Sequence, residues 1–182
     1  MKLYYLDASA WIKRYYQEDG TAWVQTLFSH NQIMTCATLG MIEVMATLSR
    51  KSKAQEITLS QFKQKARELE DDWKRFFQIP MTNEIVHVAK DLTKKLALRG
   101  SDAVHLSSAL VLQKRFAEHG ERLIMVTSDQ ELIGAATSSG LVTIQRMFAH
   151  NRYEQTKSGN SPRNSIFNAW LKFTPCFRQV ER

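Results

Sequence analysis

The sequence predicts an α/β fold, a three-layer α/β/α sandwich with a central parallel sheet. Short apolar segments typical of buried strands recur at residues 3–6, 33–35 and 123–127. Amphipathic segments of helical period lie between them, the longest at residues 59–76. Strands that alternate with helices favour a parallel sheet, because parallel neighbours need a long crossover connection. The length of 182 residues suits one domain with a tail.

The first strand, at residues 3–6, ends at Asp7, and apolar residues at helical spacing follow from residue 10 to residue 16. Asp7 is therefore expected at a strand-to-helix turn, where open α/β sheets bind ligands. The same position suits a helix N-cap. On Asp7 alone, the cap is the favoured interpretation.

The next elements are predicted from their capping residues and their periodicity. Thr21 is expected to cap a second helix, and a strand at 33–35 and a helix at 39–48 follow. Thr58 and Gln61 have the spacing of a capping box. They predict the start of the long amphipathic helix, which has a narrow apolar seam.

A short strand is expected at residues 77–81. Asn83 is expected to cap the following helix, which is broken at Gly100. Asp102 then opens a helix that is apolar nearly all round. Such a helix is expected to be buried.

Residues 123–127 form the clearest predicted strand of the chain. Ser128 and Glu131 match a second capping box and predict a helix that ends before Gly140. A last strand is expected at residues 141–144.

The formal net charge of +7 is unevenly distributed. From residue 149 to the C-terminus there are six Lys or Arg and two Asp or Glu, which is over half of the excess. A basic chain suits a polyanionic partner such as nucleic acid. Residues 1–147 are expected to form the domain, and residues 148–182 a basic extension with an aromatic patch. This extension could pack on the domain, grip a partner or stay disordered.

The two cysteines, Cys36 and Cys176, are far apart and have no zinc-ligand spacing. This usage suits a reducing compartment. The N-terminus does not resemble a signal peptide, and no apolar run is long enough to span a bilayer. The expected location is the cytoplasm, with no membrane partner.

Four carboxylates, Asp7, Glu43, Asp102 and Asp129, stand where an acidic residue needs an explanation. Asp7 and Asp129 follow strands, so these two are expected to meet at one edge of the sheet. Asp102 begins a helix and can approach them if the N-terminus of that helix points to the same edge. Glu43 interrupts an apolar helical segment, so it would reach this edge of the sheet from the middle of a helix. Ionised carboxylates that gather need a cation among them, and oxygen ligands suit Mg²⁺ or Mn²⁺. This pattern favours metal-assisted cleavage of phosphodiester bonds.

Each of these carboxylates also has an ordinary interpretation. Asp102 and Asp129 suit helix N-termini whatever the function. Glu43 needs a partner, which could be a basic side chain such as Lys13 instead of a metal. Periodicity alone leaves both interpretations open.

Three basic residues are candidates for the same site. His105 lies one turn after Asp102, where it could act as a general acid or contact RNA. The favoured interpretation is a partly buried histidine that is hydrogen-bonded near Asp102, because a metal-bound water needs no histidine base. Arg99 is the better candidate for an RNA phosphate, whereas Lys13 is either an RNA contact or a solvated side chain.

Four segments, in this order, resemble blocks of the PIN-domain ribonucleases, particularly the VapC-like toxins of bacterial toxin–antitoxin pairs. They are LDASAWIKRYYQEDGT at residues 6–21, ATLGMIEVMATLSR at 37–50, LRGSDAVHLSSAL at 98–110 and LIMVTSDQELIGAATSSGLVTI at 123–144. Each block alone is a weak signal, whereas all four in order are specific. The resemblance does not reach the C-terminal extension.

The resemblance implies a PIN-like fold and Mg²⁺- or Mn²⁺-dependent endoribonuclease activity. By position, Asp7 and Asp102 would be direct metal ligands. Glu43 and Asp129 would bind through water, hold a second metal or orient the nucleophile. Ser9 would line the pocket.

The resemblance further implies that Thr127 lines the pocket, that the protein forms homodimers, and that a cognate antitoxin blocks the pocket. No carboxylate follows directly after Asp129, since Gln130 stands there and Glu131 belongs to the predicted capping box. The ligands of a second metal are therefore not evident.

Two other function classes compete with the nuclease. One is a catalytically silent PIN-like module that binds RNA or protein, but a pocket of acids is unfavourable for binding RNA alone. The other is a phosphatase or a receiver domain with an acidic pocket. A dehalogenase-like phosphatase would need an Asp where Ser9 stands, and a receiver would need an acidic pair at Asp7.

Overall fold

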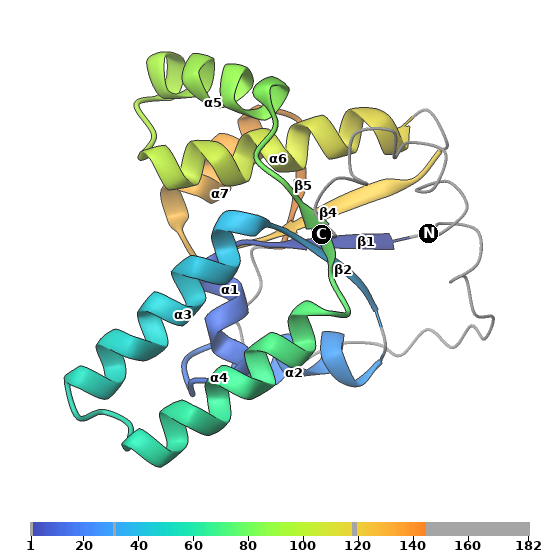
Figure 1. The fold of residues 1–182 in the computed structure, drawn as a ribbon. Helices are drawn as coiled ribbons and strands as arrows, with labels where there is room; N and C mark the ends of the chain where they lie inside the picture. The colour runs from blue at the N-terminus through green and yellow to red at the C-terminus, as the bar shows by residue number, and fades with distance from the viewer. Residues whose placement is uncertain (1, 31, 118–119, 145–182) are drawn as a thin grey trace, which may run out of the picture. The chain divides into compact units, whose positions relative to one another are not determined.

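The computed structural model describes residues 2–30, 32–117 and 120–144. Five parallel strands form a sheet in the order β3-β2-β1-β4-β5 (Figure 1). The strands are β1 Lys2–Leu6, β2 Ile33–Ala37, β3 Phe77–Ile79, β4 Arg122–Val126 and β5 Val142–Thr143. The helices are α1 Ala8–Trp11, η1 Ile12–Arg14, α2 Thr21–Ser29, α3 Thr38–Lys53, α4 Leu59–Trp73, α5 Asn83–Leu96, α6 Gly100–Ala117 and α7 Gln130–Ser138.

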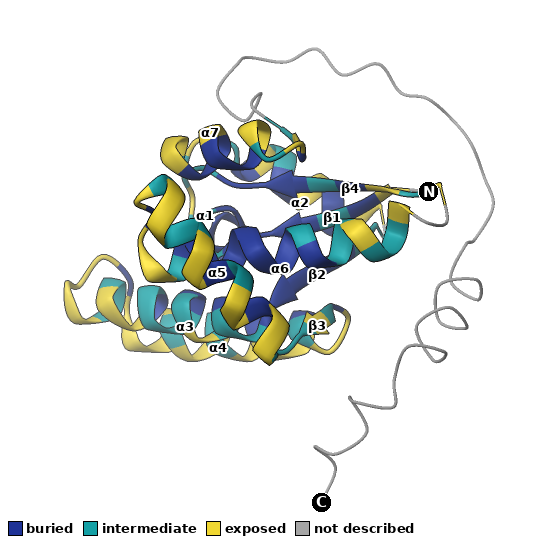
Figure 2. Ribbon diagram, turned by 90° about the horizontal axis from the view of Figure 1, so that it is seen from above, coloured by how far each residue is buried: buried dark blue, intermediate teal, exposed yellow. Residues whose placement is uncertain are grey.

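Helices cover both faces of the sheet, which confirms the predicted three-layer α/β/α fold (Figure 2). Successive side chains of a strand point to opposite faces. In β1, Leu3 and Tyr5 therefore join the core beneath α5, α6 and α7, whereas Leu6 joins the core beneath α1 to α4. The predicted burial of α6 is also confirmed, because eight of its residues are buried.

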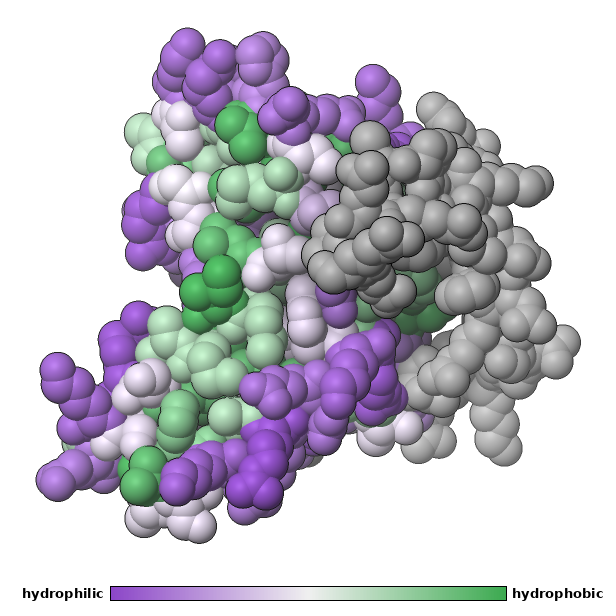
Figure 3. Space-filling view, in the orientation of Figure 1, coloured by the Kyte–Doolittle hydropathy of each residue, from purple (hydrophilic) through white to green (hydrophobic). Residues whose placement is uncertain are grey.

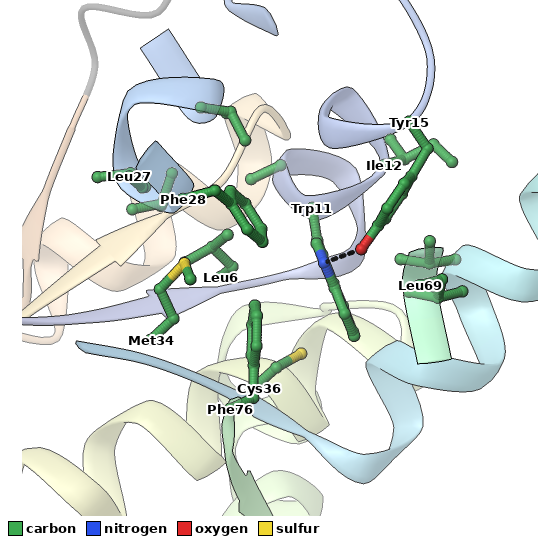
Figure 4. Close-up of a cluster of buried hydrophobic side chains, with 14 of the residues drawn as sticks. Leu6, Trp11, Ile12, Tyr15, Leu27, Phe28, Met34, Cys36, Leu69 and Phe76 are labelled. Atoms are coloured by element: carbon green, nitrogen blue, oxygen red, sulfur yellow. Dashed lines mark hydrogen bonds between the residues drawn. The ribbon is translucent and has the colours of Figure 1, made fainter. Parts of the chain in front are cut away.

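The core beneath α1 to α4 is rich in aromatic side chains (Figure 4). Trp11 stacks on Phe76 with ring centroids 4.6 Å apart, and its indole N–H donates to the hydroxyl of Tyr15 at 3.1 Å. Leu69 of α4 is fully buried in the same cluster. This packing anchors the short helix α1 directly behind Asp7.

Three capping predictions were wrong, each for a local reason. The N-cap of α2 is Gly20, whose φ of 89° favours glycine, and Thr21 instead closes the preceding turn by accepting from Glu18 N. The N-cap of α5 is Thr82, one residue before the predicted Asn83. The capping box at Thr58 and Gln61 is confirmed, and the one at Ser128 is corrected below.

The helix expected at residues 10–16 is shorter than predicted. It ends as α1 at Trp11 and continues as one 3₁₀ turn, η1. The predicted extension at 148–182 and Cys176 lie outside the described residues. Within the described part of the chain, no helix is both long enough and apolar enough to cross a membrane.

Candidate active site

The candidate site forms where the central strands β1 and β4 end side by side. The two strands pair in parallel from Lys2 with Arg122 to Leu6 with Val126. The backbone N–H of Asp7 extends this ladder by donating to the carbonyl of Val126 at 3.1 Å. The residues that follow each strand therefore meet at one sheet edge, as the sequence predicted for Asp7 and Asp129.

Asp7 is buried and fully hydrogen-bonded. The hydroxyl of Ser9 donates to both carboxylate oxygens at 2.9 Å, and the hydroxyl of Thr127 donates to one of them at 2.9 Å. The backbone N–H of Ala10 also donates to Asp7 at 2.9 Å, so the cap interpretation is confirmed. The exposed fraction of Asp7 is 4%. Burial raises the pKa of this carboxyl group, and the hydrogen bonds from Ala10, Ser9 and Thr127 oppose that rise.

Asp129 is the N-cap of α7, which corrects the capping box predicted at Ser128. One carboxylate oxygen of Asp129 accepts from Leu132 N at 3.0 Å. Ser128 instead contacts α1, because its backbone N–H donates to the hydroxyl of Ser9 at 2.9 Å. The hydroxyl of Thr127 accepts from Asp129 N at 3.1 Å, so Thr127 joins Asp7 to Asp129.

Arg99 bridges Asp102 and Asp129. Its Nε donates to Asp102 at 2.7 Å, and its Nη2 donates to Asp129 at 2.5 Å. These two bonds raise the pKa of the guanidinium, led by the bond to Asp102. The Arg99 side chain is 67% exposed, whereas Asp102 is buried in the first turn of α6. The structure thus places Asp102 and Asp129 within hydrogen-bond distance of the same exposed guanidinium, that of Arg99.

His105 is buried and hydrogen-bonded, as the favoured interpretation expected, and its partners are Glu43 and Tyr5, which the sequence did not indicate. Its Nε2 lies 2.7 Å from a carboxylate oxygen of Glu43, and its Nδ1 lies 3.0 Å from the hydroxyl of Tyr5. Tyr5 accepts from Ala37 N at 3.2 Å, and burial raises the pKa of Tyr5 well above its usual range. We therefore assign the hydroxyl proton to the bond with Nδ1 and the imidazole proton to Nε2, which donates to Glu43.

Gly40 explains how Glu43 reaches His105 from the middle of α3. A Cβ atom at residue 40 would lie 2.3 Å from Sγ of Cys36 and 3.2 Å from Cε1 of His105. Only glycine therefore allows α3 to approach so closely, and Glu43 follows one turn later on the same side. Asp7 and Glu43 both act on Cys36, whose thiol pKa is raised first by burial and then by these two carboxylates.

Sequence reasoning missed Tyr5, although a signal was present. The two-residue period of a strand places Tyr5 on the face of Leu3, which α6 covers. Lys13 is buried, and its ammonium pairs with Glu18 at 3.1 Å in the loop before α2. The expectation of a solvated Lys13 is therefore wrong, whereas an RNA contact by Lys13 stays a prediction.

A family model for the PIN domain matches residues 4–136. The chain belongs to the PIN-domain family. It is 33% identical to ribonuclease VapC45 of Mycobacterium tuberculosis over 112 residues, which cover 62% of this chain and 78% of that protein. The resemblance to VapC-like PIN-domain proteins is thereby confirmed.

Solved structures show the same PIN-domain fold at low sequence identity. PAE2754 of Pyrobaculum aerophilum has a TM-score of 0.55 at 17% identity, over 80% of this chain and 85% of the other. VapBC2 of Rickettsia felis, bound to a DNA fragment from its promoter, has a TM-score of 0.53 at 15% identity. That match covers 78% of this chain and 97% of the other.

The four predicted acids offer only oxygen atoms, which are the ligands that a hard divalent cation prefers. Arg99 contacts Asp102 and Asp129, and His105 contacts Glu43. Among the residues that the structure describes, no three His, Cys, Asp or Glu side chains are close enough together to hold a metal ion.

Proposed function

We propose that this PIN-domain protein is a Mg²⁺- or Mn²⁺-dependent endoribonuclease and the toxin of a toxin–antitoxin pair. The observation that carries the proposal is the buried carboxylate of Asp7 at the ends of β1 and β4, beside Asp129. Ligand sites of α/β sheets lie at this edge. The relative VapC45 is named a ribonuclease.

Asp7 and Asp102 would hold the cation directly, and Glu43 and Asp129 would act through water or hold a second ion. The cation, when bound, would activate water and stabilise charge that develops on the phosphate. It would also offset the burial that raises the pKa of Asp7, so that the carboxylate stays ionised.

The protein's own residues would position these acids. Ser9 and Thr127 fix both oxygens of Asp7 through hydrogen bonds that favour the ionised form. His105 fixes Glu43 and is itself oriented by Tyr5. These contacts hold the carboxylates ready for a cation and limit the reorganisation that binding requires.

Two features would draw RNA to this edge. Arg99 is exposed beside the acids and presents a planar fork that matches a phosphate. The N-terminus of α6, which carries Asp102 in its first turn, favours an anion nearby. A phosphate of RNA would therefore approach between Arg99 and the cation.

The proposed partners are a cognate antitoxin and a second copy of this chain, in the cytoplasm. Hydrophobic residues form a band along α3 on the face shown in Figure 3. On α3, Ile42 is 66% exposed directly beside Glu43, so a protein bound on this helix could cover the site. The solved relative VapBC2 is itself a complex.

Cleavage of a mixed cellular RNA pool tests the proposal. Purified protein without antitoxin is incubated with Mn²⁺ or Mg²⁺, with EDTA, and as the variant Asp7→Asn. We expect cleavage with either metal, none with EDTA, and about two to three orders of magnitude less with Asp7→Asn. Mn²⁺ binding without cleavage would favour the silent RNA- or protein-binding module instead. Cleavage that persists in EDTA would contradict the metal dependence.

A further inference from the structure

Arg99 contacts one oxygen atom of each of two proposed metal-binding acids, Asp102 and Asp129. Oδ1 of Asp129 accepts from Leu132 N as the cap of α7, so Oδ2 is the oxygen outside the cap. Arg99 binds this Oδ2 and also Oδ2 of Asp102. A cation that joins Asp102 to Asp129 would therefore meet the guanidinium at the same place.

We infer that Arg99 is a built-in competitor of the divalent cation, which displaces its guanidinium from Asp102 and Asp129. The inference rests on the proposed function and concerns how the same site is controlled. Two positive charges at one pair of oxygens repel each other. Arg99 and the cation therefore cannot both bind these oxygens of Asp102 and Asp129 at the same time. Arg99 thereby weakens metal binding in the RNA-free protein.

The position of Arg99 makes this exchange easy. Its side chain is 67% exposed and precedes the first residue of α6. Exposed ion pairs are weak, each changing an equilibrium by at most about fivefold. Two such pairs set the expected effect of Arg99 on metal affinity at roughly three- to thirtyfold. His105, by contrast, is buried and cannot leave Glu43 for solvent in the same way.

Release of Arg99 would couple the metal to the substrate. Once displaced from the two acids, the guanidinium can donate the same N–H groups to a phosphate, which it can bind through two parallel hydrogen bonds. A metal-loaded protein would therefore present both a cation and a fork-shaped donor to RNA. By linkage, RNA that captures Arg99 would also tighten metal binding.

Calorimetric titration with Mn²⁺ tests the inference on the folded, full-length chain. Arg99→Gln removes the competing charge and should bind Mn²⁺ roughly three- to thirtyfold more tightly than wild type. Arg99→Lys keeps the charge on a single nitrogen that cannot span both acids, so it should also bind more tightly. Without metal, Arg99→Gln should have the lower Tm, and saturating Mn²⁺ should remove that difference.

Arg115→Gln is the matched control. Arg115 pairs with exposed Glu84 at 2.6 Å near the other end of α6, about 20 Å from Asp102 along the helix. Like Arg99→Gln, the substitution Arg115→Gln removes one positive charge, and it should leave Mn²⁺ affinity unchanged.

Equal Mn²⁺ affinity of wild type, Arg99→Gln and Arg99→Lys would overturn the inference, as would equal tightening in Arg115→Gln. If wild type still cuts RNA in that case, the proposed nuclease stands. Tighter Mn²⁺ binding by Arg99→Gln without RNA cleavage by wild type supports the competition and contradicts the nuclease. No Mn²⁺ binding by any variant would overturn both.

Discussion

The site contains two basic side chains that hold acids in opposite ways. His105 is 1% exposed and lies between Tyr5 and Glu43, whereas the Arg99 side chain is 67% exposed and bridges Asp102 and Asp129. A buried partner fixes its carboxylate, because separation would leave a polar group without a hydrogen bond. An exposed partner exchanges readily, because water can replace it. In the proposed site, the first contact would therefore position an acid, and the second would regulate access of a cation to two others.

Asp7, which Thr127 joins to Asp129, has the largest expected effect. Asp7→Asn should lower RNA cleavage by about two to three orders of magnitude, because it removes a metal-binding charge but keeps the shape. The same variant should unfold at a higher temperature than wild type without metal, because burial opposes the charge of Asp7. Cleavage rates and thermal melts check both parts. A variant that is less stable than wild type would contradict the burial argument.

The buried contact is tested at His105. His105→Leu removes the donor to Glu43 and should lower kcat by about 10- to 100-fold. His105→Gln retains a donor and should recover part of that loss. Tyr5→Phe should have a smaller effect of the same kind, because it only orients the imidazole. If both proteins are folded and kcat falls equally in His105→Leu and His105→Gln, the hydrogen bond to Glu43 does not determine kcat.

Gly40 tests whether close packing of α3 supports the buried contact. Gly40→Ala places a Cβ atom against Cys36 and His105, so it should lower the free energy of unfolding by about 1–3 kcal/mol. Gly134→Ala in α7 is the control, because a Cβ there meets nothing within 4 Å. It should be neutral or slightly stabilising. Urea denaturation of both variants gives the comparison, and equal stabilities would contradict the packing argument.

The smallest expected effect is a pH dependence of stability that comes from Asp7. Its pKa is raised in the folded protein, so the folded state binds a proton more tightly than the unfolded state. Stability should therefore fall as pH rises from the ordinary value of 3.8 through the raised value. Asp7→Asn lacks this contribution, so its advantage over metal-free wild type should grow across that window. Urea denaturation at several pH values measures the difference, and a constant difference would contradict the assignment.

The fold was predictable because it depends on local patterns that the sequence displays. The apolar strand before Asp7 and the largely apolar helix that begins near Asp102 each indicated an element and its burial. The edge of the sheet where Asp7 and Asp129 meet followed from parallel strands alone. Errors concentrated at helix starts, where several neighbouring residues such as Ser128 and Asp129 are equally good caps.

The pairing within the site was not predictable, because it depends on contacts between elements far apart in sequence. His105 was expected to be hydrogen-bonded near Asp102, but the sequence did not indicate that its partner is Glu43, 62 residues away. That contact depends on Gly40, whose lack of a side chain sets the distance between α3 and α6. Tyr5 was missed for a similar reason. It is a core residue, but its hydroxyl contacts His105 on α6.

Anomalous diffraction from crystals soaked in Mn²⁺ is the most direct test of a cation among these acids. We expect a manganese peak contacted by Asp7 and Asp102, with the Arg99 side chain turned away from Asp129. His105 should still contact Glu43 in the same crystal. Well-ordered carboxylates without a manganese peak, and with Arg99 still bridging Asp102 and Asp129 at saturating Mn²⁺, would contradict both the metal site and the exchange.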